Sequence, residues 1–173
     1  MRATMPNTSM AIANEFLKKP GALGRLTQMQ LLKLAYIAHG WNLAVNGSPL
    51  LSEPVRAWDY GPVVTDLYDH IKFYGTGPVT NLVSTADSVA TRFFGSAQRN
   101  DAEVYEASLT PQEQAVIDHV WQRYGMYTGF RLSDMTHKSG TPWFQTYFGE
   151  GKNSIIPNDR IRQHYVELAR AVV

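Results

Sequence analysis

The segment from Thr27 to Gly47, TQMQLLKLAYIAHGWNLAVNG, constrains the fold of this chain more than any other. It opens with Thr27-x-x-Gln30, a pattern in which each side chain accepts a hydrogen bond from the backbone N–H of the other residue at a helix start. It closes on Asn46-Gly47, and glycine commonly ends a helix because it readily adopts a positive φ. The sequence therefore predicts a helix with a defined start and end.

Apolar side chains cover most sides of this predicted helix. On a helical wheel one face and much of the next are apolar: Leu31, Leu34, Ala35, Ala38, Trp41 and Val45, then Leu32, Tyr36 and Leu43. Only a strip with Lys33, Gly40 and Ala44 lacks a large apolar side chain. Because a helix that is apolar on most sides is surrounded by its domain, we expect this helix to be central. Gly40, which lowers helix propensity, predicts that another element crosses closely there.

Other helices are predicted by their own start and stop signals. Thr110-Pro111-Gln112-Glu113 is a second capping pattern with proline at the first helical position. The expected helices are residues 9–19, starting at Thr8 or Ser9, then 110–125, 131–137, a turn at 143–148, and 158–172, with Ile161, Tyr165, Leu168 and Val172 on one face. These segments favour a helical protein.

The segment EPVRAWDYGPVVTDLYDHI, residues 53–71, joins an extended piece to another predicted helix. We expect Val55 to Trp58 to be extended. Gly61-Pro62 is then expected to start a helix, because proline costs no hydrogen bond at the first helical position. That helix is expected to end near Tyr74-Gly75.

Residues 76–108 are rich in small and polar residues and have no sustained period. We expect this segment to be irregular, with short strands near Ala90–Phe94 and Val104–Tyr105. Because binding specificity often resides on loops carried by a rigid scaffold, partner-specific contacts are expected here.

These features predict a mainly α fold, namely a single compact helical domain of about six helices with at most a small β-sheet or hairpin. The chain has 173 residues, of which 44% are hydrophobic, enough for one sizeable core. We expect residues 1–8 to be a flexible N-terminus and residues 9–173 to form the domain, with the irregular segment 76–108 inside it.

The composition offers little for catalysis or for a cofactor. The chain has no cysteine, and no two of its five histidines lie three or four residues apart, so neither a zinc site nor a thiolate nucleophile is expected. Phosphate-binding and nucleophile-elbow glycine motifs are absent from the sequence. We therefore expect no metal, no cofactor and no enzymatic activity. Because there is also no apolar run for a signal peptide or a membrane span, we expect a cytoplasmic protein without a membrane partner.

Charge and aromatic residues leave two further possibilities open. Lys and Arg number 16 against 15 Asp and Glu, which counts against nucleic acid, although Arg160, His164 and Arg170 could share a face of the last helix. Three aromatic residues, Trp58, Tyr60 and Trp143, sit at predicted junctions. An aromatic side chain there either braces a corner of the fold or anchors a partner, and we favour the corner.

Two blocks of the sequence together resemble the Panacea domain family, the SocA-like antitoxins also described as GepA-like phage-associated proteins. The first block contains L-x-K-L around Lys33, A-x-G-W, G-x-P-L, and W-x-Y-G-P-V. The second is LSDMTHKSGTPW, which matches L-S-x-x-T-H followed by P-W. The motif residues taken as possible partner contacts are Lys33, Trp58, Asp59, Tyr60, Gly61, Pro62, Thr136, His137 and Trp143. His39 departs from the family pattern, in which glutamine is more frequent.

The resemblance implies a helical antitoxin-type module that neutralises a cognate protein toxin encoded by an adjacent gene. It implies two routes, namely direct binding or action as a proteolysis adaptor that presents the toxin to an ATP-dependent protease. The alternative is a phage- or mobile-element-associated regulator that binds nucleic acid through the last helix.

Overall fold

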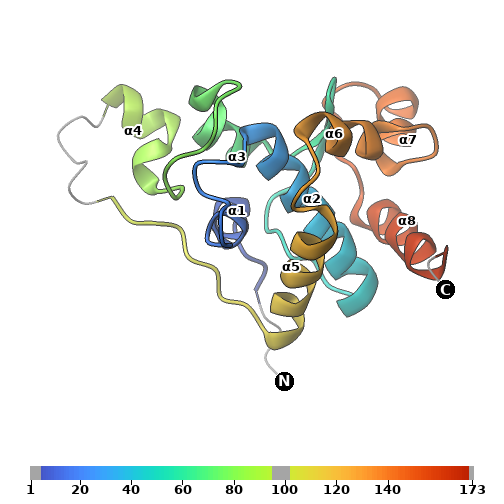
Figure 1. Ribbon diagram of the computed structural model, residues 1–173. Coiled ribbons are helices and arrows are strands. Elements are labelled where there is room, and N and C mark those ends of the chain that lie inside the picture. The colour runs from blue at the N-terminus through green and yellow to red at the C-terminus, as the bar shows by residue number, and fades with distance from the viewer. Residues whose placement is uncertain (1–4, 95–101, 172–173) are drawn as a thin grey trace.

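The computed structural model describes residues 5–94 and 102–171 (Figure 1). The mainly α prediction is confirmed, with eight α-helices in these residues where about six were expected. The helices are α1 (Ser9–Leu17), α2 (Gln28–Asn46), α3 (Thr65–Ile71), α4 (Val89–Phe94), α5 (Pro111–Tyr124), α6 (Gly129–His137), α7 (Pro142–Gly149) and α8 (Asn158–Ala171). The remaining elements are strands β1 (Arg56–Trp58) and β2 (Gly61–Val63) and two 3₁₀ turns, Lys72–Tyr74 and Thr85–Asp87.

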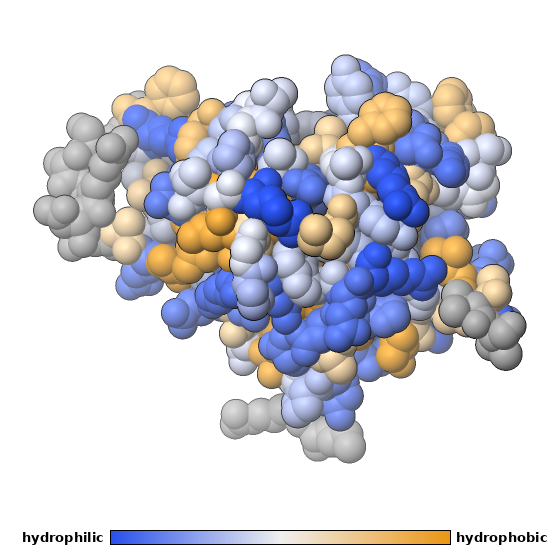
Figure 2. All heavy atoms as spheres, in the orientation of Figure 1, coloured by the Kyte–Doolittle hydropathy of each residue, from blue (hydrophilic) through white to orange (hydrophobic). Residues whose placement is uncertain are grey.

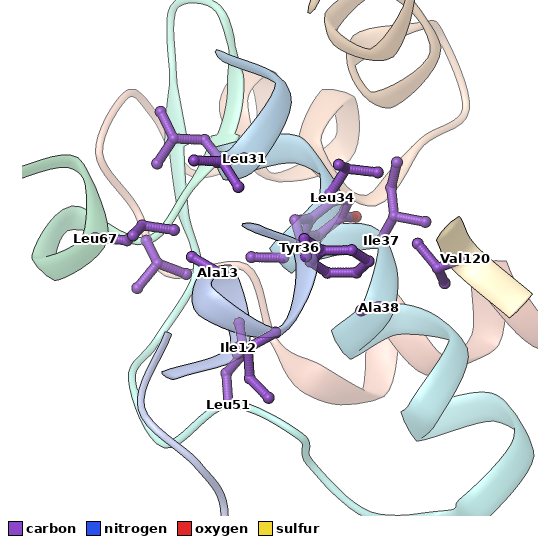
Figure 3. Packing of buried hydrophobic residues seen from close by; sticks show 14 of the residues in the cluster. Ile12, Ala13, Leu31, Leu34, Tyr36, Ile37, Ala38, Leu51, Leu67 and Val120 are labelled. Carbon is purple, nitrogen blue, oxygen red and sulfur yellow. The ribbon is translucent and has the colours of Figure 1, made fainter. Parts of the chain in front are cut away.

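Helix α2 is the centre of the domain, as its sequence predicts. Both hydrogen bonds of the Thr27–Gln30 capping box are present, and Gly47 ends the helix with a φ of 72°. Every residue from Gln30 to Leu43 is buried. Helices α1, α3, α5, α6 and α8 all pack against α2, and Figure 3 shows apolar side chains from α1, α2, α3 and α5 pointing toward one another.

The close crossing predicted at Gly40 is made by α8. The ring of Tyr165 lies where a Cβ on Gly40 would be, so only glycine allows the two helices to approach this closely. Tyr165 is itself buried, with its ring edge-on to Tyr36 and Trp41. Ile161 is buried on the same helix, whereas Val172, which was expected on this face, lies outside the described residues.

The expectation that Gly61-Pro62 starts a helix is wrong. These residues begin β2, which pairs antiparallel with β1 in the register Arg56↔Val63, Ala57↔Pro62, Trp58↔Gly61. Helix α3 starts only at Thr65 and ends at Ile71, and the 3₁₀ turn that follows carries the chain to Gly75, where the end was predicted.

The hydrogen bonds of Ala57 explain why proline fits in this strand. Ala57 donates its N–H to Ser154 O (2.9 Å) and accepts from the N–H of Asn153 (2.7 Å), so it has no ladder bond to make with Pro62. The missing N–H of Pro62 therefore costs the hairpin nothing. Residues 153–156 act as a third extended segment beside β1, since Ile156 N–H also bonds to Val55 O (2.8 Å).

The segment 76–108 is only partly irregular. Residues 89–94 form helix α4, not the strand expected near Ala90–Phe94, and Figure 1 shows this helix at the end of the molecule opposite α7 and α8. At the second expected strand, Val104 makes an isolated antiparallel bridge with Ser84. Residues 95–101 lie outside the described residues.

The other helix predictions are confirmed. Helix α1 begins after Thr8, helix α5 has the expected capping box and ends before Gly125, and helices α6, α7 and α8 start within two residues of the expected positions. In the part of the chain that the structure describes, none of the helices has the length and apolarity needed to cross a membrane. The division into a flexible stretch 1–8 and a domain 9–173 stays a prediction, and residues 1–4 lie outside the described residues.

A groove beside the hairpin as candidate functional site

A groove of about 1110 Å³ lies between the β1–β2 hairpin and the amino ends of α2 and α6. Its walls are mostly apolar and aromatic, with a few polar groups. The lining residues are Thr27, Gln28, Met29, Leu32 and Lys33; Trp58, Asp59, Tyr60 and Val63; Tyr68, Gly75 and Thr76; Gly129 and Phe130; and Lys152 and Asn153. A mostly apolar concavity with a small number of polar groups is the usual form of a binding site.

The structure brings together part of the set of residues predicted from the sequence. Four of the nine, Lys33, Trp58, Asp59 and Tyr60, line the groove. The other five support the lining from behind: Gly61 and Pro62 in β2, Thr136 and His137 in α6, and Trp143 in α7. The predicted residues therefore form one connected region, of which about half faces the groove.

Lys33 in α2 is the most unusual of these residues, because lysine side chains are rarely buried and this one has 0% of its surface exposed. Its Nζ donates to the carbonyl oxygen of Pro62 at 2.9 Å, the one hydrogen bond it makes within the described residues. Burial lowers the pKa of Lys33 from 10.5 to about 7, because the charged form loses its hydration. On the helical wheel Lys33 lies on the strip without large apolar residues, and in the structure the hairpin covers this part of the strip through Gly61 and Pro62.

Gly61 makes room for this lysine. Its φ is +107°, a conformation that an L side chain rarely adopts, and a Cβ there would lie 2.8 Å from Lys33 Nζ. The same Cβ would lie 3.4 Å from Thr136 Oγ1, so Gly61 is enclosed by α2 on one side and α6 on the other. The Gly-Pro step thus shapes the pocket for the buried amine.

Two tryptophans brace the hairpin in different ways. Trp143 is buried, and its Nε1 donates to the carbonyl oxygen of Trp58 at 2.6 Å. Trp58 is half-buried, with its Nε1 donating to Asn153 Oδ1 at 3.0 Å and its ring edge-on to Tyr68 at 5.1 Å. Trp143 therefore fits the corner interpretation, whereas Trp58 both supports the corner and lines the groove.

Tyr60 does not fit the corner interpretation, because 73% of its surface is exposed. Only its backbone is held, by Ser133 Oγ, which donates to Tyr60 O at 2.8 Å. Phe130, which also lines the groove, is 84% exposed. Exposed aromatic side chains at the rim of a concavity are typical of binding surfaces. Figure 2 shows hydrophobic side chains at the surface over α6 and α7, next to strongly hydrophilic ones.

Asp59 is already paired. Its carboxylate accepts from Lys152 Nζ at 2.6 Å and from the hydroxyl of Tyr147 at 2.7 Å. These hydrogen bonds lower the pKa of Asp59, that from Lys152 contributing more than that from Tyr147. The pair joins the hairpin tip to the loop after α7, and it leaves Asp59 without a free charge for a ligand.

Thr136 and His137 have local roles in α6. The hydroxyl of Thr136 donates to the carbonyl oxygens of Leu132 (2.9 Å) and Ser133 (3.0 Å), both within its own helix. His137 Nδ1 is hydrogen-bonded to Ser133 O, and the ring packs edge-on against Trp143. Neither residue lines the groove, so their place in the motif is explained by packing behind it.

Among the lining residues that the sequence did not predict are Gly129 and Phe130 at the start of α6, and Lys152 in the loop after α7. Thr128, a favourable residue just before a helix, was the available signal for the start of α6: it caps the helix by accepting from Arg131 N–H at 3.1 Å. From the sequence the helix was expected to start at Arg131, whereas it starts at Gly129. The position of Lys152 depends on the pairing of residues 153–156 with β1, for which no local pattern exists.

The basic face proposed for the last helix is partly occupied. Arg160 binds Glu150 through both of its terminal nitrogens at 3.0 Å, and it also donates to Thr146 Oγ1 at 2.6 Å. His164 is half-buried, and burial lowers its pKa. Within the described residues no group of three His, Asp or Glu side chains could hold a metal ion.

Comparison with known proteins places the chain in a family. Residues 31–144, well over half of the chain, match the family described as Antitoxin SocA-like, Panacea domain. Antitoxin SocA of Caulobacter vibrioides (strain NA1000 / CB15N) is 28% identical over 144 residues, which cover 83% of this chain and 72% of that protein. No solved structure matches the chain. The resemblance drawn from the two sequence blocks is therefore confirmed, and the chain belongs to the SocA-like antitoxin family with a Panacea domain.

Proposed function

We propose that this protein neutralises a cognate protein toxin by binding a segment of the toxin in the groove between the hairpin and the amino ends of α2 and α6. Membership in the family supports an antitoxin role, and thus a toxin partner, in general. The observation that carries the finer proposal is the groove itself, which is lined by the motif residues Trp58 and Tyr60 and by the exposed ring of Phe130.

The shape of the groove favours a protein segment as its occupant. Drug-sized ligands occupy pockets of about 300–1,000 Å³. This groove is at or above the upper end of that range, at about 1110 Å³, and two exposed aromatic side chains stand at its rim. Aromatic side chains supply much of the binding energy at protein interfaces. No catalytic step is needed for neutralisation by such contacts, in line with a protein that is not an enzyme.

The toxin is proposed to be the product of an adjacent gene, and both proteins are proposed to act in the cytoplasm. Two routes to neutralisation remain within the proposal. The bound protein either blocks the toxin directly or presents it to an ATP-dependent protease. The two routes differ in the fate of the toxin, because only the second lowers its concentration.

Co-expression tests the proposal. Each neighbouring gene product is expressed alone and together with this protein, and growth is recorded. We expect one neighbour to arrest growth, growth to be restored by this protein, and the two proteins to purify together. Failure of every neighbour to arrest growth, or arrest that persists despite a soluble complex, contradicts the proposal. Rescue in cells that lack the protease, with an unchanged toxin level, separates direct blocking from delivery.

Variants of the rim connect the function to the groove. Tyr60→Ala and Phe130→Ala should lose rescue while the protein stays folded. Met126→Ala is the matched control, because Met126 is 79% exposed, close in sequence to Phe130, and outside the groove. Equal rescue by all three variants would indicate that the toxin binds elsewhere on the surface.

The nucleic-acid alternative receives no support from the geometry. Of the residues that could form a basic face on α8, Arg160 is committed to Glu150, and Arg162 donates to Leu43 O at 3.2 Å. Binding to phosphates is expected to weaken steeply with salt, so a gel-shift series at increasing salt is the test that would revive this alternative.

A further inference from the structure

The turn at the tip of the hairpin does not by itself fix the position of Tyr60. Trp58 pairs with Gly61, so the loop between the strands is Asp59-Tyr60. Two-residue hairpin loops favour turns with a positive φ at the first loop residue, because these turns match the twist of the strands. In the described part of the chain, Asn153 is the one non-glycine residue with a positive φ, so both loop residues have negative φ. A turn of this kind tends to splay the strands, and the tip needs support from outside the hairpin.

Ser133 in α6 supplies that support at Tyr60. Its Oγ donates to Tyr60 O at 2.8 Å, and Ser133 is only 7% exposed, so water competes little for this hydrogen bond. The side-chain pair at the tip, Asp59 with Lys152, is 49% and 62% exposed. Exposed ion pairs of this kind contribute little to stability. The hydroxyl of Ser133 is therefore the stronger constraint on the backbone of Tyr60.

The same helix carries the other exposed aromatic residue of the groove. Phe130 precedes Ser133 by three residues in α6, and residues three apart in a helix are neighbours on its surface. One rigid element thus supplies Phe130 and the hydroxyl that holds Tyr60. The relative position of the two aromatic residues is set by α6, and a site that is ordered before binding loses less conformational entropy when its partner binds.

We propose that Ser133 is a positioning residue of the groove, whose hydroxyl holds the hairpin tip so that Tyr60 and Phe130 form one preorganised pair for the toxin. Ser133 is not part of the groove lining, so it acts on the bound segment through Tyr60. The toxin as partner rests on the proposed function, whereas the holding of the tip rests on the hydrogen bond alone.

The first test needs no toxin. Nuclear magnetic resonance relaxation measures the order parameters of the Tyr60 and Gly61 amides in wild type, Ser133→Ala and Ser9→Ala. Ser9→Ala is the matched control, because Ser9 is also buried and its hydroxyl also makes a long-range hydrogen bond, to Glu53 Oε1 at 2.7 Å, but outside the groove.

We expect order parameters near the rigid value of about 0.85 in wild type and in the Ser9→Ala control. In Ser133→Ala they should fall toward the flexible range below about 0.6. The rest of the spectrum should show that the variant is folded. A mobile tip in wild type, or an unchanged order parameter in Ser133→Ala, overturns the proposal.

The second test measures the affinity of the purified variants for the neighbouring gene product that arrests growth. Ser133→Ala should weaken binding at least about threefold, as the loss of one hydrogen bond allows, and Ser9→Ala should not weaken it. In a Tyr60→Ala background, adding Ser133→Ala should weaken binding less than about twofold, because the residue through which it acts has been truncated. A loss of the same size in both backgrounds is what a merely structural role predicts, and it overturns the proposal.

The failure of this proposal is distinguishable from that of the proposed function. Wild-type affinity of both Tyr60→Ala and Phe130→Ala would overturn toxin binding in the groove, and the role of Ser133 in binding with it. Weaker binding of these two variants, with wild-type affinity of Ser133→Ala, would overturn only the role of Ser133.

Discussion

The variant Lys33→Met should be more stable than wild type at pH 7. This difference in stability should disappear as the pH approaches 10.5. The sign follows from the pKa, which is 10.5 for an exposed lysine and about 7 for Lys33 in the folded protein. Between these values the unfolded chain holds a proton that the folded protein does not, so stability rises with pH in this window. The cost of burying Lys33 is absent above pH 10.5 and full below pH 7.

The magnitude follows from the same two values. A shift from 10.5 to about 7, at about 1.4 kcal/mol for each pH unit, makes the cost of the buried lysine about 5 kcal/mol well below pH 7. At pH 7 the cost is about 4 kcal/mol, because about half of the folded molecules have already lost the proton. Methionine has a similar volume and removes that cost, but it leaves the carbonyl of Pro62 without its donor, a loss of about 1–3 kcal/mol. The net gain is about 1–3 kcal/mol, or roughly 3–10 °C in melting temperature for a chain of this size.

Urea and thermal unfolding at pH 7, 8.5 and 10 measure this prediction. We expect Lys33→Met to be more stable than wild type at pH 7 and no more stable at pH 10. Lys138→Met is the control: the side chain of Lys138 is 62% exposed, and its loss should change stability by less than about 0.5 kcal/mol at every pH. A less stable Lys33→Met protein at pH 7, or a difference that does not vary with pH, refutes the account of a destabilising buried amine.

Three other substitutions probe the hairpin and its surroundings. Gly61→Ala should lower the free energy of unfolding by about 2–4 kcal/mol, because it combines a φ of +107° with a Cβ 2.8 Å from Lys33 Nζ; an unchanged denaturation midpoint contradicts this. Burial lowers the pKa of His39, and the hydrogen bond to Asn158 opposes this shift only in part. Because the unfolded chain then binds a proton more readily than the folded protein, wild type should lose stability as the pH falls below 6.5. His39→Gln should reduce that loss in melts at pH 8 and pH 5, and equal slopes would rule the histidine out as the cause. Trp58→Ala should lower the free energy of unfolding by about 2–3 kcal/mol, less than the loss of a core tryptophan, since the ring of Trp58 is half-buried. A melting temperature equal to that of wild type would show that the ring does not stabilise the hairpin corner.

The central helix could be predicted from the sequence because its signals are local. The capping box at Thr27, the stop at Gly47 and the apolar positions between them lie within one segment, and they agree with the structure except at Val45, which is 64% exposed. The close crossing at Gly40 was predictable for the same reason, although its partner Tyr165 was not.

The hairpin was not predictable from local signals. Proline after glycine suits a helix start and an edge strand equally well, and here the decision lies with Ala57, whose hydrogen bonds go to residues 153–154. The environment of Lys33 was hidden for a related reason. A lysine on the least apolar strip of a helix is expected to face water, and only the position of β2 buries it.

The candidate site was half predictable. The aromatic motif residues Trp58 and Tyr60 line the candidate groove, but the groove is also formed by the start of α6 and the loop after α7. Those segments reach the groove through tertiary packing, which the spacing of residues along a single sequence does not encode.

Binding of the toxin in the groove is the proposal on which the others depend. Its most direct test is the affinity of the purified protein for the neighbouring gene product that arrests growth, measured by calorimetry for wild type, Phe130→Ala and the control Met126→Ala. We expect a loss of at least about tenfold for Phe130→Ala, which corresponds to about 1.4 kcal/mol, and wild-type affinity for Met126→Ala. Equal affinities for all three proteins, with the complex still formed, would contradict it.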